Sequence, residues 1–585
     1  MTVVAEFAAT LVDEWVRAGI GHAVCAPGSR SAPLTRALLE DGRIALHVRL
    51  DERSAAFFAL GLALASARPV IVVTTSGTAA AELHPAVLEA DLSRVPLICC
   101  TADRPPELHH VGAPQTLEQE QLFSGALRFA CSPGVPDEAG RATWRSLAAR
   151  LVAEALSGPA GPGPVHCNLA FREPLVVERG ELPPGRREGR PFHEVLRAPG
   201  TSAVVSDRFA AELQGARRCL VVVGGGIDPV ARAPILRGAR RLGAPVVAEV
   251  RAWPREPGED EDVLVAAADQ LLRSPRATAT LAPEVVVRVG APPLSKVLSA
   301  WLGRLGDATR QILIDPFGQF LDPERRSDLV LGADPASLFA DLSVRLPGRN
   351  AHADLAWAKS WRTAEHAAQS AIDATLSSQA ASEPALARAL YAAVPAHSTI
   401  FASSSMPVRD LEWFAAPRAG APRVLANRGA NGIDGVTSTL LGVASARSQK
   451  PGTVVGLIGD LAFLHDLSAL VVGRHERLPA LRLIVVDNAG GGIFSFLDYA
   501  ASMEPERFER GFGTPQRQSP LEVAAALGWA ARPLVGTEGL DVLLAEPPES
   551  LEVLVFSSER GANLEVHRAL ERNVAEHVDA ALAKG

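Results

Sequence analysis

The chain has 585 residues, which is too many for a single hydrophobic core, so roughly two to four domains are expected. Apolar residues make up 47% and charged residues 21%, as in ordinary soluble proteins. The formal net charge of −8 argues against a nucleic-acid-binding surface, which is usually basic.

The cysteines and the N-terminus argue against export and membrane insertion. Six cysteines in so long a chain are sparse, and none has the spacing of metal ligands, which fits reduced thiols. Residues 5–19 have the pattern of an amphipathic helix, because acidic and basic residues interrupt the apolar positions. No uncharged apolar stretch is long enough to span a bilayer. We therefore expect a cytoplasmic protein with no membrane partner.

Short apolar runs alternate with helical patterns along most of the chain, which is typical of doubly wound parallel sheets. The strands expected are 22–27, 45–50, 69–75, 96–102, 219–226, 244–250, 284–290, 312–316, 398–404, 452–460, 481–488 and 550–556. Stretches rich in proline, glycine and arginine at 178–200 and 346–353 are predicted linkers. The sequence thus predicts three α/β domains, at 1–180, 200–345 and 355–585.

Polar residues at two neighbouring strand ends give the strongest chemical signal. The expected strand 452–460 ends in Gly459 and Asp460, and the strand 481–488 ends in Asn488 before a glycine run at 490–492. In a parallel unit both ends reach the same edge of the sheet. Carboxylate and amide oxygens suit Mg²⁺, and glycines allow a close approach to phosphate. A metal and diphosphate site is therefore expected there.

Several strings of residues resemble one family. They are APGSRSAPLT, RLDERSAAFFALGLALAS, TTSGTAAAELHPAVLEA, TADRPPEL, SMPVRD, NRGANGIDG, GDLAFLHDLSAL and GGGIFSFL. Together they resemble the 2-succinyl-5-enolpyruvyl-6-hydroxy-3-cyclohexene-1-carboxylate synthase family of thiamine-diphosphate-dependent enzymes. The resemblance covers both outer domains, which would bind the pyrimidine (N-terminal) and the diphosphate (C-terminal). It is weaker in the middle domain, which is expected to be Rossmann-like.

The resemblance implies a cofactor site for thiamine diphosphate with Mg²⁺ or Mn²⁺. Glu52, which from spacing alone looks like a first-turn helix residue after the N-cap Asp51, would activate the pyrimidine ring. The implied metal ligands are Asp460, Asn488 and the Gly490 carbonyl. Asp487 stands where the family has Asn and is left out of this set. The other implied cofactor contacts are Ser76, Gly77, Thr78, Ser405, Met406, Ile433, Gly459, Leu461, Gly491, Ile493 and Phe494.

The resemblance also implies two acidic substrates, 2-oxoglutarate and isochorismate. Arginine binds carboxylates with two parallel hydrogen bonds. Arg30, Arg104 and Gln115 would face isochorismate, while Arg409, Arg428, Ser404 and Ser405 would help to hold the part derived from 2-oxoglutarate. Lys296 is a further substrate-binding candidate, and Arg30, Arg409 and Arg428 join Glu52 as expected catalytic residues. The implied reaction is decarboxylation followed by 1,4-addition to isochorismate, in menaquinone biosynthesis.

Other interpretations stay open at this stage. Ser404 replaces a family Asn, which leaves room for altered affinity or rate. The departures at Asp487 and Ser404 leave a non-catalytic relative open, and an acetolactate-synthase-like enzyme of other 2-oxo acids is a separate alternative. The run at 221–229 suggests a dinucleotide oxidoreductase, but Asp228 and Pro229 interrupt the G-x-G-x-x-G pattern. Enzymes of this class place the cofactor between two subunits, so a homodimer or homotetramer is implied.

Overall fold

The computed structural model describes residues 3–178, 180–195, 200–257, 263–346, 350–379, 381–477 and 479–584. These residues form three six-stranded sheets with parallel strand pairs, which confirms the predicted fold class. By packing, the chain divides into two compact units: Met1–Ala198 with Asn427–Lys450 and Ala462–Ala480, and Pro199–Ala426 with Pro451–Leu461 and Leu481–Gly585. The proposed boundaries of the three domains stay a prediction. No helix in the described part of the chain has the length and apolar character needed to cross a membrane.

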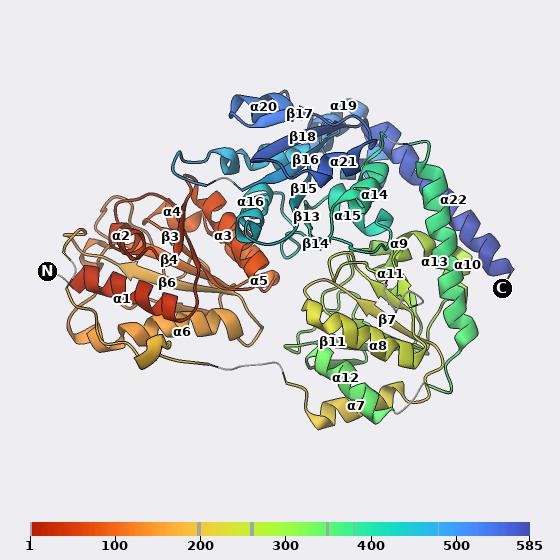
Figure 1. Ribbon diagram of the computed structural model, residues 1–585, viewed down its shortest axis with the longest axis horizontal. Coiled ribbons are helices and arrows are strands. Elements are labelled where there is room, and N and C mark those ends of the chain that lie inside the picture. The colour runs from red at the N-terminus through yellow and green to blue at the C-terminus, as the bar shows by residue number, and fades with distance from the viewer. Residues whose placement is uncertain are drawn as a thin grey trace. The chain divides into compact units, whose positions relative to one another are not determined.

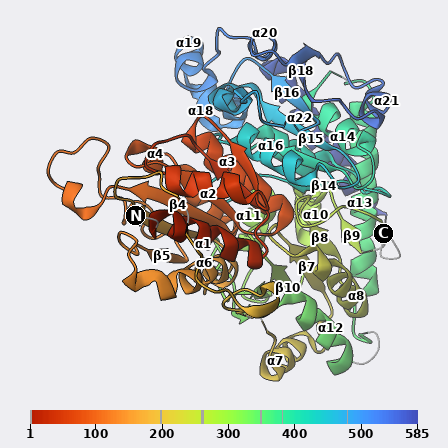
Figure 2. The same cartoon turned by 60° about the vertical axis from the view of Figure 1, so that its left-hand side comes forward.

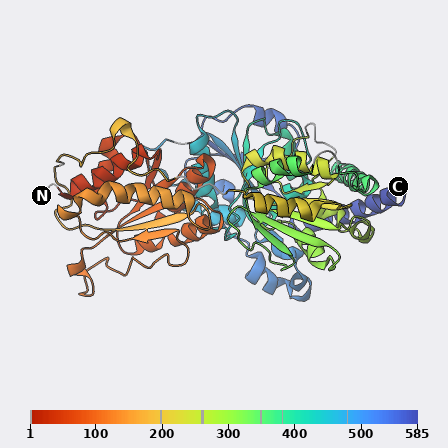
Figure 3. The same cartoon turned by 90° about the horizontal axis from the view of Figure 1, so that it is seen from below.

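The first sheet has the order β2-β1-β3-β4-β6-β5. Its helices lie on both faces (Figures 1 and 3). On one face α1, α2 and α6 pack over a core that contains Phe7, Trp15, Leu38 and Trp144. The strands are β1 His22–Cys25, β2 Ala45–Val48, β3 Val70–Thr74, β4 Leu97–Asp103, β5 Phe129–Cys131 and β6 Pro164–Ala170. The helices are α1 Val3–Arg17, α2 Ala32–Asp41, α3 Glu52–Ser66, α4 Thr78–Ala81, α5 His84–Leu92 and α6 Trp144–Ser157, with short 3-10 turns η1 Pro106–Leu108, η2 Ala139–Thr143 and η3 Arg187–Gly189.

The second sheet has the order β12-β11-β10-β7-β8-β9, which is the 3-2-1-4-5-6 order of dinucleotide-binding folds. The long helices α13 and α22 run side by side (Figures 1 and 2), and their apolar residues join α9, α10 and α11 over one face of this sheet. The strands are β7 Cys219–Val223, β8 Val246–Ala248, β9 Leu264–Val265, β10 Val285–Val289, β11 Arg310–Asp315 and β12 Leu329–Gly332. The helices are α7 Ala203–Leu213, η4 Pro229–Ala231, α8 Arg232–Leu242, α9 Ala268–Leu271, α10 Pro275–Thr280, α11 Lys296–Arg304, α12 Pro335–Arg345 and α13 Leu355–Leu376.

The third sheet, β14-β13-β15-β16-β18-β17, repeats the strand order of the first. Helices α14, α15 and α21 cover one face through Leu386, Leu390, Leu411 and Leu540. The strands are β13 Thr399–Ala402, β14 Arg423–Leu425, β15 Val454–Gly459, β16 Leu481–Asp487, β17 Ala530–Pro533 and β18 Leu551–Ser557. The helices of this part of the chain are α14 Glu383–Ala393, α15 Met406–Phe414, α16 Val436–Arg447, α17 Asp460–His465, η5 Leu467–Leu470, η6 Gly492–Phe496, α18 Asp498–Ser502, α19 Pro505–Phe508, η7 Glu509–Gly513, α20 Pro520–Ala526, α21 Leu540–Ala545 and α22 Arg560–Ala583. Of these, α16, η5 and residues 462–465 of α17 belong to the first unit.

Candidate active site

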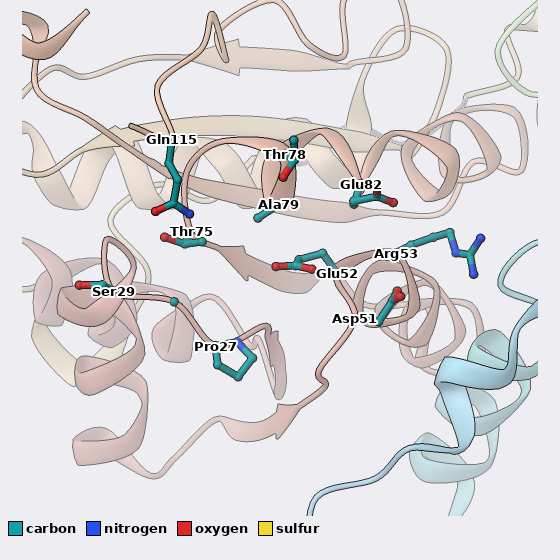
Figure 4. A pocket seen from close by; sticks show the side chains of 11 residues that line it. Pro27, Ser29, Asp51, Glu52, Arg53, Thr75, Thr78, Ala79, Glu82 and Gln115 are labelled. Carbon is teal, nitrogen blue, oxygen red and sulfur yellow. The ribbon is translucent and has the colours of Figure 1, made fainter. Parts of the chain in front are cut away.

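A cavity of about 610 Å³ lies at the carboxyl ends of β1, β2 and β3 in the first unit. Open parallel sheets bind ligands where the strand order reverses, which here is between β1 and β3. The segments 27–29, 51–53 and 75–79 form its walls, and Figure 4 shows Glu52 pointing into the space between them. A Cβ atom on Gly28 would lie 2.3 Å from Cβ of Thr75, so only glycine lets the two walls approach this closely.

Glu52 is the first residue of α3, and Asp51 caps that helix by accepting a hydrogen bond from the Ser54 amide at 2.8 Å. Burial raises the pKa of the Glu52 carboxyl, and the nearby charges of Asp51 and Glu82 add to this rise, while its own backbone N–H opposes it. Glu52 therefore keeps a proton to higher pH than an ordinary glutamate. A carboxyl group of this kind can exchange a proton with a ring nitrogen placed in the cavity.

The predicted cofactor contacts Ser76, Gly77 and Thr78 connect β3 to α4 beside the cavity. Gly77 has φ 86° and its amide donates to Oε1 of Gln119 at 2.8 Å. The Gln119 side chain is buried and donates in turn to Ala102 O and Asn168 Oδ1. This glutamine was not predicted as a site residue, because a lone Gln in an irregular segment carries no sequence signal.

Arg104 and Arg30, two of the arginines predicted to bind substrate, lie near each other. Arg104 donates through Nη1 to Ser76 Oγ at 3.0 Å and through Nη2 to Gln115 Oε1 at 3.5 Å, and Gln115 itself lines the cavity. Burial and then the charge of Arg30 lower the pKa of Arg104. Arg30 is buried, donates to the Phe171 carbonyl at 2.9 Å and pairs with Glu173 at 3.3 Å. An anionic ligand would relieve this cationic crowding.

Arg428 and Ile433 lie in the segment that precedes α16, also in the first unit. Glu89 anchors this segment, since its carboxylate accepts from the amides of Gly429 and Ala430 at 2.8 and 2.7 Å. Arg428 is half-buried, and Ile433 is 37% exposed. Their contribution to a cofactor or substrate site remains a prediction.

Asp460 lies in the second unit, directly after β15, and is 5% exposed. Its Oδ1 accepts from the Leu461 amide and its Oδ2 from the Gly490 amide, both at 2.7 Å. Burial raises the pKa of Asp460 to about 7 despite these two hydrogen bonds, with further contributions from the charges of Asp487 and Glu383. A bound cation would offset the cost of this buried negative charge.

Asn488 follows β16 and is 8% exposed. Its Nδ2 donates to Glu383 Oε1 at 2.9 Å, while its Oδ1 is buried without a hydrogen-bond partner among the described residues. Buried polar atoms are seldom left unpaired, so an unpartnered amide oxygen beside Asp460 fits a hard cation such as Mg²⁺. The described residues hold no cluster of three His, Cys, Asp or Glu side chains that could bind a metal, so a metal here depends on amide and carbonyl oxygens.

Close backbone contacts within the protein explain the glycine run after Asn488. Gly490 has φ 130°, and a Cβ there would lie 1.8 Å from the Gly513 carbonyl oxygen. The Gly491 amide donates to that same oxygen at 2.7 Å, and the half-buried Phe494 packs edge-on against Phe512. Asp487 accepts from the Ala489 amide at 3.2 Å, a turn contact that gives its carboxylate a role other than metal binding. Ile493 lies in the 3-10 turn η6 that follows.

The segment between β13 and α15 approaches Gly459, whose amide donates to Ser403 Oγ at 3.3 Å. Ser404 is buried, Ser405 has φ 73°, and Met406 opens α15. Such a φ is uncommon for a residue with a Cβ, and strained backbone conformations cluster at functional sites. Arg409 Nη1 donates to the Ser405 carbonyl at 2.5 Å, and burial lowers its pKa.

The part of the chain that forms the second sheet and its helices contains the residues of two sequence predictions: the substrate-binding candidate Lys296 and the glycine-containing run at 221–229. Lys296 is exposed at the start of α11, and no described contact brings it to the other candidate residues. A close backbone contact requires glycine at position 224, because a Cβ on Gly224 would lie 1.8 Å from the Ala291 carbonyl oxygen. Asp228 caps η4 by accepting from the Val230 amide, so a capped turn follows the glycines before α8 begins.

Residues 5–122 match the family described as thiamine pyrophosphate enzyme, N-terminal TPP binding domain. The chain is 44% identical over 581 residues to the 2-succinyl-5-enolpyruvyl-6-hydroxy-3-cyclohexene-1-carboxylate synthase of Thermobifida fusca (strain YX), covering 97% of this chain and 98% of that protein. It is 38% identical to the synthases of the same name from Geobacillus kaustophilus (98% of each chain) and Myxococcus xanthus (97% of each).

A solved structure supports the fold. The crystal structure of benzoylformate decarboxylase from Polynucleobacter necessarius is similar with a TM-score of 0.69 and covers 96% of this chain and 99% of that one. At 15% identity this likeness concerns the architecture alone.

Proposed function

The chain belongs to the 2-succinyl-5-enolpyruvyl-6-hydroxy-3-cyclohexene-1-carboxylate synthase family, and from this premise we propose the reaction that it catalyses. The chain decarboxylates 2-oxoglutarate and adds the succinyl carbanion equivalent to isochorismate by 1,4-addition. The products are 2-succinyl-5-enolpyruvyl-6-hydroxy-3-cyclohexene-1-carboxylate and CO₂, within menaquinone biosynthesis. The structural observation that supports this most is the buried Asp460 beside Asn488, whose Oδ1 has no partner in the described chain.

The described residues fit the diphosphate end of thiamine diphosphate with Mg²⁺ or Mn²⁺. Asp460, Asn488 and the Gly490 carbonyl would hold the metal, and Gly459, where an added Cβ would meet nothing within 4 Å, leaves room beside it. When bound, the cofactor supplies the nucleophilic carbon and stabilises the negative charge that decarboxylation leaves.

The protein's own groups supply proton transfer and substrate orientation. Glu52 holds a proton at the pyrimidine ring, a task that suits its raised pKa. Arg30, Arg104 and Gln115 orient the carboxylates of isochorismate, while Arg409, Arg428 and Ser404 hold the 2-oxoglutarate-derived part. Lys296 is kept as a further substrate-binding residue. We further propose that the protein acts in the cytoplasm as a homodimer or homotetramer, with the cofactor bound between subunits.

The test is an assay of the purified protein with thiamine diphosphate, Mg²⁺, 2-oxoglutarate and isochorismate. Loss of isochorismate and release of CO₂ should require every component. Consumption of 2-oxoglutarate without loss of isochorismate would contradict the proposed acceptor. Consumption of pyruvate in place of 2-oxoglutarate would identify an acetolactate-synthase-like enzyme. A protein that binds the cofactor but converts no 2-oxo acid would be a non-catalytic relative.

A further inference from the structure

We propose that Glu383 is a positioning residue that orients Asn488 for metal binding. This inference rests on the proposed function, since it assumes that Asn488 is a metal ligand. Glu383 is the first residue of α14, it is 4% exposed, and it lies 105 positions before Asn488 in the sequence. Its role is to fix which end of the Asn488 amide faces the metal.

Two donors converge on a single oxygen of Glu383. Oε1 accepts from Asn488 Nδ2 at 2.9 Å and from Ser558 Oγ at 2.7 Å. These donors follow β16 and β18, which are adjacent strands of the third sheet. A carboxylate oxygen accepts and does not donate, so it attracts the NH₂ end of the amide and turns the oxygen away.

The opposite end of the amide shows the consequence. Asn488 Oδ1 is buried, without a hydrogen-bond partner among the described residues, and the amide of the next residue but one, Gly490, donates to Asp460. An amide that could rotate would present nitrogen to the metal in one of its two orientations. Groups that hold a metal ligand in place commonly account for 10–100-fold in metal affinity, by order of magnitude.

The helix start keeps Glu383 itself in place. Ser382 is the N-cap of α14 and accepts from the Ala385 amide at 3.3 Å, and Pro384 stands in the first turn. Ser558 is also joined to the sheet, since its amide donates to the Asp487 carbonyl at 3.0 Å. The position of the acceptor, Glu383, is therefore fixed by backbone hydrogen bonds, and these bonds do not involve the metal.

The experiment is a double-mutant cycle on the full-length protein with thiamine diphosphate, in which Mn²⁺ affinity is measured by electron paramagnetic resonance. We expect Glu383→Ala to weaken Mn²⁺ binding about 10–100-fold, and Glu383→Gln, which keeps an acceptor oxygen, to stay within about 3-fold of the wild type. In an Asn488→Ala background, Glu383→Ala should change the affinity less than about 2-fold, because its effect acts through Asn488.

Equal losses of affinity in both backgrounds, or a wild-type affinity in Glu383→Ala, would overturn the proposal. Glu365→Ala is the matched control, since Glu365 is also buried and accepts a backbone amide, from Ala267; it should leave Mn²⁺ affinity unchanged. If Glu383→Ala does not fold, Ser558→Ala removes one of the two donors to Glu383 and should weaken binding by a few-fold, and no change would count against the proposal. Product formation is measured separately, so a failed synthase assay with an intact cycle would contradict the proposed function alone.

Discussion

The first and third sheets have the same strand order and place candidate residues at the same four strand ends, yet the chemistry at those ends differs. In the first sheet they carry Glu52, a partly buried glutamate that lines a cavity, and two neighbouring arginines, Arg30 and Arg104, of which Arg104 contacts the cavity residue Gln115. In the third sheet they carry the buried Asp460 and an amide oxygen, Asn488 Oδ1, that has no hydrogen-bond partner in the part of the chain that the structure describes. Under the proposed function, one topology thus provides two kinds of site: one for proton transfer and substrate carboxylates, the other for a cation and diphosphate.

Glu52→Gln tests the role of the first sheet and has the largest expected effect. A glutamine cannot exchange a proton, so the rate of product formation should fall by roughly 10²–10⁴-fold while calorimetry still detects cofactor binding. Glu82→Gln is the control, because Glu82 lines the same cavity and should not matter to this extent. A normal rate of product formation in Glu52→Gln would contradict the assignment of proton transfer to the first sheet.

Asp460→Asn tests the role of the third sheet. Loss of a charged metal ligand should weaken Mg²⁺-dependent cofactor binding by about 100-fold or more, as measured by calorimetry. Asp487→Asn restores the family residue at a position whose carboxylate contacts the Ala489 amide, and it should bind the cofactor normally. Weak binding in Asp487→Asn and normal binding in Asp460→Asn would reverse the assignment of the two carboxylates.

Arg104→Ala should raise the KM for isochorismate by about 10-fold, because it removes a charge-assisted hydrogen bond to a substrate carboxylate. The KM for 2-oxoglutarate should change less. Arg172→Ala serves as the control, since Arg172 forms an exposed ion pair with Glu107. An equal rise in both KM values would contradict the division of the arginines between the substrates.

The smallest effect concerns Asp466, which accepts from the amide and hydroxyl of Ser438 in α16. Burial raises its pKa from 3.8 to about 6, so its contribution to stability is present below about pH 4 and is lost as the pH rises through 6. Asp466→Asn cannot ionise, so its melting temperature relative to the wild type should increase by a few degrees between pH 4 and pH 7.5. A pH-independent difference would contradict this.

Sequence patterns predicted the central strands well, because buried parallel strands are continuous apolar runs. They missed six strands: β6, which carries the buried polar residues His166 and Asn168, and the short strands β5, β9, β12, β14 and β17. Strand ends could be predicted from the same runs, which is why Asp460 and Asn488 were correctly placed at the ends of neighbouring strands. The sequence could not show Gln119 or Glu383, because their roles depend on hydrogen bonds to residues distant in the chain.

The glycines of the candidate sites could also be interpreted only in part from the sequence. Their clustering after β16 predicted a close approach of the backbone to phosphate, but the structure explains Gly490 by the approach of the Gly513 carbonyl, which no local pattern reveals. The same holds for Gly28, which is required by Thr75 on a neighbouring strand end. Contacts between distant segments, rather than local propensity, decide these positions.

The most direct test of the two-sheet account is the exchange of the thiazolium C2 proton of thiamine diphosphate for deuterium, followed by NMR with Mg²⁺ present. We predict rapid exchange with the wild-type protein. In Glu52→Gln the cofactor should stay bound but exchange should be slow, and in Asp460→Asn the cofactor should be largely unbound. Exchange at the wild-type rate in Glu52→Gln would contradict the assignment of proton transfer to the first sheet.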